Sequence, residues 1–406
     1  MKNTISALLL GTAIALSVGG VASADDKVVK IGVLSDQSGL YADLAGPGST
    51  LAAQMAIEDS GLKAKGWTID LVSGDHQNKP DIGTTIARQW FDVDKVDTIV
   101  DVPNSGVALA VNNVVKEKNG VYINSGAATS DLTNAQCTPN TVHWTYDTYM
   151  LAHATGQALV KAGGDTWFFL TADYAFGAAL ERDTTAVITA NGGKVVGGVK
   201  HPLNTADFSS FLLQAQASKA KIIGLANAGG DTTNSIKQAA EFGIVKGGQK
   251  LAALLLFLTD VKAIGLETAQ GLNFTETFYW DLNDNTRAFS KRFSEKLKSG
   301  APPTMVQAGV YAGLLHYFKA LEALGGNPHD GAKVVAKMKT IPTDDPLFGK
   351  GEVEANGRVT HDAYLFEVKK PSESKGPWDF YKLVGTVPGI QAFTPLDKST
   401  CALLKK

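Results

Sequence analysis

Short apolar runs alternate with segments of helical periodicity along the first two thirds of the chain. Runs rich in β-branched residues at 29–34 and 67–72 are typical of buried strands, and a helical pattern follows each of them. Strands that alternate with helices of this length predict mainly parallel sheets covered on both faces. The pattern starts again after 145–147, so we expect an α/β fold with two doubly wound lobes and a cleft between them. The strands expected in the second lobe are 166–171, 194–199, 222–226 and 251–258.

Two successive strands turn directly into helical segments. The run 98–100 ends at Pro103-Asn104, and Ser105 opens a helix; the run 120–124 is followed by a turn that contains Thr129. A helix that begins in this way leaves N–H groups that a hydroxyl can cap, or share with a bound anion. Because ligands of such sheets bind beyond the carboxyl ends of the strands, we interpret the two turns as neighbouring edges of one carboxylate site. The alternative is that Ser105 and Thr129 only cap helices.

The last third of the chain shows no third lobe. Its apolar runs are too scattered for a sheet of their own, so we expect these pieces to complete the two lobes. The expected elements are an extended segment at 272–280, helices at 286–297, 305–324 and 330–339, and strands at 363–368 and 380–384.

The N-terminal segment has the pattern of an export signal. Lys2 precedes an apolar run at 7–18, and the small residues at 22–24 form a cleavage pattern. The apolar part is too short to anchor the chain in a bilayer. We therefore expect residues 1–24 to be removed and the mature protein to be exported.

The chain contains only two cysteines, Cys137 and Cys401. In an oxidising compartment such a pair can form a disulfide, which would tie the C-terminal tail to the first lobe. We predict this bridge; the alternative is two buried unpaired thiols.

Charge and motifs exclude several classes of function. The net charge of −2 comes without a basic cluster, so nucleic acid and anionic membrane surfaces are poor candidates for partners. The sequence has no nucleophile elbow, no zinc-protease helix and no phosphate-binding loop, and its seven histidines lack metal-type spacing. We expect no enzyme, no metal and no cofactor; an exported hydrolase that uses Ser105 is the weaker alternative.

A set of motifs spread over the chain carries a family resemblance. They are VKIGVLSDQSG at 29–39, DHQNKP at 75–80, NSG at 104–106, AAT at 127–129 and DYAFG at 173–177. Together they resemble the branched-chain amino-acid-type periplasmic solute-binding proteins of ABC transporters, over essentially the whole mature chain. The resemblance implies a type I periplasmic-binding fold, whose two lobes are joined by three crossovers and close on a ligand.

The resemblance also implies where the lobes begin and end. The crossovers would fall near 145–147, 276–279 and 355–361. The protein would be a periplasmic monomer that delivers its ligand to ABC-transporter permease subunits at the inner membrane. The first lobe would comprise 25–145, 279–356 and 386–406, and the second lobe 146–278 and 357–385.

By position, Ser105 matches the family serine that holds the ligand carboxylate. Ala127 and Thr129 match a second turn that supplies a backbone N–H and a hydroxyl to the same group. We count Asn104, beside Ser105, with this site.

Two loops of the second lobe matter for the choice of ligand. Asn227 and Asp260 lie where amino-acid binders supply partners for the ligand ammonium, but Asp260 is only the nearest match to the acidic residue there. Leu44 stands where many members carry a tyrosine, and Tyr41 is displaced from that position. Both departures weaken the case for an amino-acid ligand.

The amino-acid sequences of several motifs are most similar to those of binders of aromatic carboxylates such as benzoate or cinnamate. We therefore predict a small aromatic acid as the ligand, with branched-chain amino acids or small amides as the alternative. Rings could form an apolar slot of the kind that holds small apolar acids, or could belong to core and hinge packing. The rings in question are Tyr41, Tyr174, Phe176, Phe257, Tyr279 and Trp280.

Overall fold

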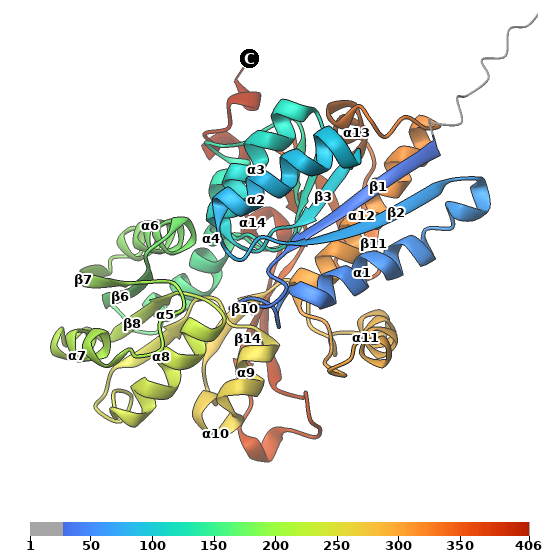
Figure 1. Cartoon of the computed structure of the whole chain (residues 1–406). Coiled ribbons are helices and arrows are strands. Elements are labelled where there is room, and N and C mark those ends of the chain that lie inside the picture. The colour runs from blue at the N-terminus through green and yellow to red at the C-terminus, as the bar shows by residue number, and fades with distance from the viewer. Residues whose placement is uncertain (1–26, 406) are drawn as a thin grey trace, which may run out of the picture.

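Two parallel sheets organise residues 27–405, the part of the chain that this computed structural model describes (Figure 1). The predicted export signal, residues 1–24, lies outside the described residues. The first sheet has the order β2-β1-β3-β4-β5 and forms the first lobe; the second has the order β7-β6-β8-β9 and forms the second lobe. The first sheet contains β1 (Val28–Ser35), β2 (Thr68–Asp75), β3 (Thr98–Asp101), β4 (Val121–Asn124) and β5 (Thr141–His143). The second contains β6 (Thr166–Ala172), β7 (Lys194–His201), β8 (Ile222–Ala226) and β9 (Lys250–Ala253).

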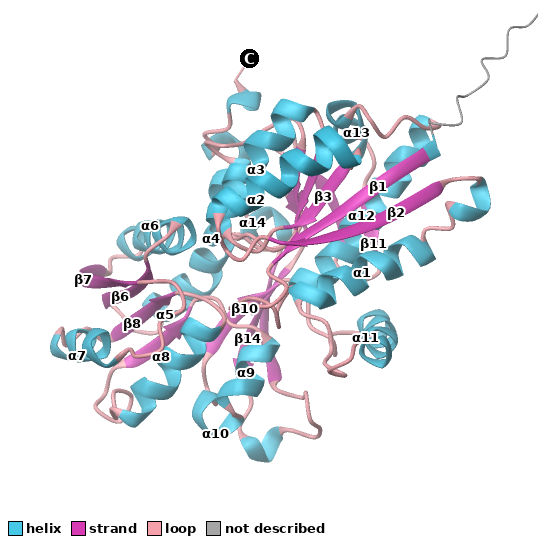
Figure 2. Cartoon of the chain, in the orientation of Figure 1, coloured by secondary structure: helices cyan, strands magenta, loops and turns pink. Residues whose placement is uncertain are grey.

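Helices cover both faces of the first sheet, as Figure 2 shows. Alternate residues of β3 point to opposite faces: Val100 packs in a cluster with Met55 and Ala308, whereas Ile99 packs in another cluster with Val111. This alternation follows from the two-residue period of a strand. The covering helices are α1 (Gly46–Asp59), α12 (Met305–Leu324) and α13 (Gly331–Met338) on one face, and α2 (Pro80–Gln89) and α3 (Ser105–Lys118) on the other.

The second lobe repeats the arrangement and begins with an irregular helix. The segment predicted as a helix after the first crossover consists of α4 (Thr148–Leu151), a π-helical turn η5 (Ala152–Gly156) and α5 (Gln157–Lys161). β9 ends at Ala253 rather than at the predicted residue 258, because residues 254–257 leave the sheet before α9 begins. The further helices of this lobe are α6 (Ala175–Ala190), α7 (Ser209–Ala217), α8 (Gly230–Glu241), α9 (Leu258–Ile264) and α10 (Leu266–Ala269). Two helices contact other elements: α11 (Asp284–Lys296) packs on α1, and α14 (Gly389–Ala392) lies near β13.

The last third of the chain contains two small antiparallel sheets, so the expectation of no further sheet is wrong. Antiparallel strands can be joined by tight turns, and short runs therefore suffice to form a sheet. Phe274, Phe366 and Tyr381 from one of these sheets pack in the core of the second lobe, so the last third does complete existing cores as expected. The sheets are β10 (Asn273–Glu276), β14 (Ala363–Val368) and β15 (Tyr381–Val387), and β11 (Thr343–Asp345), β12 (Gly349–Val353) and β13 (Val359–Thr360).

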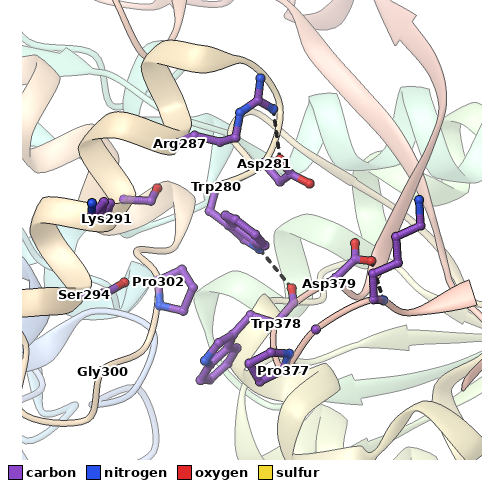
Figure 3. Close-up of a pocket in the computed structure, with 13 residues that line it drawn as sticks. Trp280, Asp281, Arg287, Lys291, Ser294, Gly300, Pro302, Pro377, Trp378 and Asp379 are labelled. Carbon is purple, nitrogen blue, oxygen red and sulfur yellow. Dashed lines mark hydrogen bonds and ion pairs between the residues drawn. The ribbon is translucent and has the colours of Figure 1, made fainter.

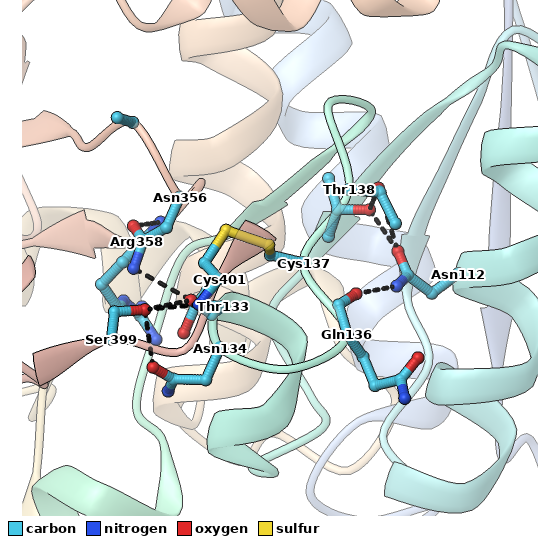
Figure 4. Close-up of a disulfide and its surroundings, with 12 residues drawn as sticks. Asn112, Thr133, Asn134, Gln136, Cys137, Thr138, Asn356, Arg358, Ser399 and Cys401 are labelled. Atoms are coloured by element: carbon cyan, nitrogen blue, oxygen red, sulfur yellow. Dashed lines mark hydrogen bonds between the residues drawn. A yellow bond between two sulfur atoms is a disulfide. The ribbon is translucent and has the colours of Figure 1, made fainter. Parts of the chain in front are cut away.

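The predicted disulfide between Cys137 and Cys401 is confirmed, with 5.6 Å between the two Cα atoms (Figure 4). Next to it the Ser399 hydroxyl donates a hydrogen bond to Asn134 Oδ1 over 2.8 Å. The C-terminal tail is thereby fixed to the segment that follows β4 and its turn.

The segments after β5 and before β13 lie side by side. The backbone N–H of His143 donates to the Gly357 carbonyl over 2.8 Å. The buried Arg358 forms an ion pair with the buried Asp147 over 3.4 Å and donates to the Thr145 carbonyl. This contact joins two of the three segments that the family resemblance identifies as crossovers; the lobe boundaries stay a prediction. No helix among the described residues is long and apolar enough to cross a membrane.

Candidate ligand-binding site

The first turn, residues 101–106, leads from β3 into α3. Its N-terminal cap is Asn104, whose Oδ1 accepts hydrogen bonds from the N–H groups of Gly106 and Val107 over 2.9 and 3.1 Å. Because Asn104 caps the helix, the Ser105 hydroxyl is not needed for capping. The backbone N–H of Ser105 has no hydrogen-bond acceptor among the described residues.

The second turn, residues 125–130, follows β4 and lies directly against the first. The backbone N–H of Thr129 donates to Ser105 Oγ over 3.2 Å, which brings together the two residues that the sequence predicted as neighbours. Asn124 shapes this turn, because its Oδ1 accepts the Ala127 N–H over 2.9 Å. Thr129 Oγ1 accepts the N–H of Asp131 over 3.3 Å, so this hydroxyl also caps the short helix that follows.

Beside the two turns lies an interlobe cavity with an aromatic lining. The hydroxyl groups of Tyr41 and Tyr174 meet across it and are 2.6 Å apart. The cavity volume is about 10 Å³, which is roughly the space needed by the centre of one water molecule. The lining consists of Tyr41, Leu44, Pro103 and Ala128 from the first lobe, Tyr146 from the connecting segment, and Tyr174, Phe176, Ala228, Leu255 and Phe257 from the second lobe.

Hydrogen bonds within each lobe fix the positions of the rings. Asp36 Oδ2 accepts the N–H of Tyr41 over 2.8 Å and its Oδ1 accepts the N–H of Gly39 over 2.7 Å, so this carboxylate shapes the loop that carries Tyr41. The Tyr146 hydroxyl donates to the Gly126 carbonyl over 2.7 Å, and its ring meets Phe257 edge-on. Tyr146 was missed as a site residue because the sequence placed it in a crossover; an aromatic residue at that point was the available signal.

Of the predicted site residues, Tyr41, Tyr174, Phe176 and Phe257 line the cavity, whereas Asn104, Ser105, Ala127 and Thr129 belong to the two turns beside it and are not part of the lining. Asn227, Asp260 and Tyr279 do not line it either. The Asn227 side chain stays within its own lobe, where its Oδ1 accepts the Thr232 hydroxyl over 2.8 Å. Asp260 Oδ2 accepts the N–H of Phe257 over 2.9 Å and so caps α9. Tyr279 is stacked on Tyr381 in the core of the second lobe, with ring centres 4.6 Å apart.

The lining of the interlobe cavity contains no charged side chain. Burial raises the pKa of the Asp260 carboxyl, which lies behind Phe257, to about 7. Burial likewise raises the pKa of Tyr41 and Tyr174, so both hydroxyl groups stay protonated at neutral pH. The cavity therefore presents neutral rings and hydroxyl groups.

Polar contacts join the two lobes beside the second turn. The Ser130 hydroxyl donates to Asp183 Oδ2 over 2.8 Å, and Arg182 forms an ion pair with Asp131 over 3.1 Å. Both partners in the second lobe belong to α6, the helix that begins next to Tyr174. The same helix thus contacts the second turn and carries Phe176 into the cavity.

A larger groove of about 370 Å³ lies between α11 and the loop 375–379 (Figure 3). Trp280 donates from its ring nitrogen to the Trp378 carbonyl over 2.9 Å there. Its rim charges are largely paired with each other or with near neighbours, since Arg287 contacts Asp281 over 2.9 Å and Lys369 contacts Asp379. The two turns joined through Ser105 and Thr129 lie beside the smaller interlobe cavity, so we take that cavity as the candidate ligand site.

Two α/β lobes that meet over an internal cavity form an arrangement that can enclose a small ligand. Residues 28–376 match the periplasmic binding protein family, and the chain belongs to this family. It is a periplasmic solute-binding protein of the ABC-transporter type, a class of binding proteins rather than enzymes. The two-lobed fold expected from the resemblance is confirmed.

Solved structures agree with this assignment. A periplasmic binding protein from Burkholderia mallei is 53% identical, with a TM-score of 0.90, and the match covers 93% of this chain and 100% of that one. A branched-chain amino acid ABC transporter periplasmic ligand-binding protein from Burkholderia xenovorans LB400 is 44% identical, with a TM-score of 0.82 and the same coverage. An R. palustris solute-binding protein in complex with benzoate shares the fold, at 23% identity and a TM-score of 0.81, over 92% of this chain and 99% of that one.

Proposed function

We propose that the protein captures a small aromatic carboxylate in the interlobe cavity and delivers it to the membrane permease of an ABC importer. The observation that carries this proposal is the convergence of two elements at one place: the joined turns of Ser105 and Thr129, and the rings contributed by both lobes. The turns provide polar groups for an acid, and the rings provide apolar surface.

The two turns supply neutral donors for a carboxylate. The hydroxyl groups of Ser105 and Thr129 each have a proton to donate, since in the contacts above both oxygens act as acceptors. The N–H groups of Ser105 and Ala128 find no acceptor among the described residues. The N-terminus of the 14-residue helix α3 adds a partial positive charge at the same place.

The remainder of the cavity suits an apolar ring. Tyr41, Tyr146, Tyr174, Phe176 and Phe257 all line it, and aromatic rings pack favourably edge-to-face or offset against another ring. Small-molecule sites of this kind combine a mostly apolar wall with a few placed polar groups.

Branched-chain amino acids are the second candidate, because the Burkholderia xenovorans LB400 relative carries that name. An amino acid also brings an ammonium group, which needs an anionic or carbonyl partner when it is buried. Asp260, the nearest match to such a partner, directs Oδ2 to the N–H of Phe257 and does not line the cavity. This arrangement favours a ligand without an ammonium group.

Binding requires the lobes to separate. A cavity of about 10 Å³ does not admit a benzoate-sized molecule, so the Tyr41–Tyr174 contact and the contacts of Asp183 must open first. Ligand held by the first lobe then shifts the equilibrium toward closure, because the second lobe adds further contacts to it. A permease that distinguishes the closed lobes would receive the loaded protein.

Replacing Ser105 by alanine tests the carboxylate part of the proposal. We expect titration calorimetry to show benzoate binding to the wild type, more tightly than leucine. In Ser105→Ala the affinity should fall at least about tenfold, since a hydrogen bond to a charged group contributes about 1.5–3 kcal/mol. Ser210→Ala, an exposed position on α7, is the matched control and should bind as the wild type does. Binding of leucine alone would refute the aromatic ligand, and unchanged affinity in Ser105→Ala would move the carboxylate elsewhere.

A further inference from the structure

The Asp101 carboxyl lies between the two turns. It is fully buried at the end of β3, where Asp101 pairs with Asn124 of β4. Its Oδ2 accepts the Ser35 hydroxyl over 2.7 Å. Its Oδ1 lies against Gly126 of the second turn, so closely that a Cβ atom on Gly126 would be 2.6 Å away. Asp101 therefore belongs to the first turn, and its side chain contacts the second turn.

No cation neutralises this carboxyl, because no ion pair of the described residues includes Asp101. The groups that face it are the hydroxyls of Ser35 on β1, Ser49 on α1 and Ser125 on the second turn. Asp101 Oδ1 and the hydroxyls of Ser49 and Ser125 lie close together without a well-formed hydrogen bond among the described residues. Each hydroxyl can donate to an ionised carboxyl or accept from a protonated one, so these surroundings also accommodate a proton on Oδ1.

The backbone at this point is strained. Asp101 and Val102 have φ angles of +79° and +57°, in the left-handed region. This conformation is unusual for any residue other than glycine and exceptional for a β-branched one. Strained residues persist where the surrounding structure holds them, and they cluster at ligand sites.

Resting on the proposed function, we propose that Asp101 carries a proton whenever the two turns hold a carboxylate anion, so that capture of the anion takes up one proton from solvent. Two buried negative charges this close together would repel each other strongly, and protonation of Asp101 removes one of them. The ligand thus enters as an anion, and the site as a whole gains no net charge.

The electrostatic surroundings support this proposal. Burial, the largest effect, and the neighbouring Asp36 raise the pKa of Asp101 and the three serine hydroxyls lower it, which together leaves the pKa at about 7. The other titratable groups that face it are the phenols of Tyr122 and Tyr146, whose own pKa values burial raises. A bound anion adds one more negative charge and raises the pKa of Asp101 again.

The proton uptake that accompanies binding is measured by titration calorimetry with benzoate as the probe. Between pH 5.5 and 8.5 benzoate stays ionised, so its own titration does not contribute. We expect Kd to be nearly constant below pH 6 and to rise toward about tenfold per pH unit above pH 7. At pH 8, titrations in Tris and in phosphate should differ in apparent enthalpy by an amount that corresponds to nearly one proton taken up.

Asp101→Asn should abolish both effects, because it keeps the shape of the side chain and removes its titration. Asparagine tolerates the left-handed backbone at this position. The matched control is Asp345→Asn, since Asp345 is another buried carboxyl of the first lobe with a pKa raised by burial. The control should keep the pH slope and the proton uptake of the wild type.

Retention of the pH slope in Asp101→Asn, or the absence of proton uptake in the wild type, would overturn the inference. If Asp101→Asn does not fold, the presence or absence of proton uptake in the wild type still tests the inference. If the proposed aromatic ligand is wrong, the result is different: the wild type binds leucine and does not bind benzoate. In that case the titrations are repeated with leucine, whose carboxylate requires the same proton, and its pH slope must again disappear in Asp101→Asn.

Discussion

Arg358→Met is expected to lower the free energy of unfolding by about 3–5 kcal/mol, because it leaves the buried Asp147 without its partner. Both side chains are only 1% exposed, and their ion pair spans 3.4 Å. Arg358 also donates to the carbonyls of Thr145 and Val359, so the loss affects both neighbouring segments. Urea unfolding followed by circular dichroism measures the change.

The double variant Arg358→Met, Asp147→Asn is the matched control for this prediction. Without the buried charge the penalty for the missing partner largely disappears, so the double variant should be more stable than Arg358→Met alone. Burial raises the pKa of Asp147 against the opposing effect of Arg358, which fits a carboxyl that depends on this one cation. Equal stability of Arg358→Met and the wild type would show that the ion pair does not hold the two segments together.

Loss of the disulfide is expected to have an effect of similar size. Replacing Cys137 and Cys401 by serine should lower the free energy of unfolding by about 2–5 kcal/mol, because the bridge restricts the unfolded chain. The two residues are 264 positions apart, so the loop that the bridge closes is long. We also expect weaker benzoate binding, since the bridge and Ser399 fix the segment that follows the second turn.

A reducing agent provides the control for the disulfide. It should lower the melting temperature of the wild type to that of the Cys137→Ser, Cys401→Ser variant and leave the variant unchanged. A wild type that melts at the same temperature with and without reductant would contradict a stabilising role.

The joining of Ser105 and Thr129 could be predicted from the sequence because it depends on topology. Parallel strands place their carboxyl ends at the same edge of the sheet, and the order β1-β3-β4 makes the two turns neighbours. The disulfide could also be predicted, since only one pairing of two cysteines exists. The first inference needed only the order of the strands and the second only the number of cysteines, so neither required the position of any side chain.

Residues whose side chains have a choice of partners could not be assigned in this way. Asn227 follows the end of β8 as predicted, yet its Oδ1 accepts the hydroxyl of Thr232 in the first turn of α8. Tyr279 and Tyr146 both lie in predicted crossovers, but Tyr279 packs in the core of the second lobe whereas Tyr146 lines the cavity. Sequence position does not distinguish these outcomes, because they depend on the direction of the side chain.

The alternative interpretation, in which Ser105 only caps its helix, is wrong for a related reason. Ser105 and Asn104 are both good capping residues, and the sequence alone does not say which of them precedes the first helical turn. Asn104 takes the cap. The sheet of β11, β12 and β13 was missed because β11 and β13 have only three and two residues, which leaves no periodic pattern to detect. The strands of the other sheet were expected at 272–280, 363–368 and 380–384, but their pairing into a sheet was not.

A crystal structure of the protein with benzoate tests the central claim most directly. We predict the carboxylate within hydrogen-bond distance of the Ser105 and Thr129 hydroxyls, and the ring between Tyr41, Phe176 and Phe257, in a cavity wider than the one described here. A benzoate bound in the groove of Trp280 and Trp378, or one whose carboxylate points away from the two turns, would contradict the account.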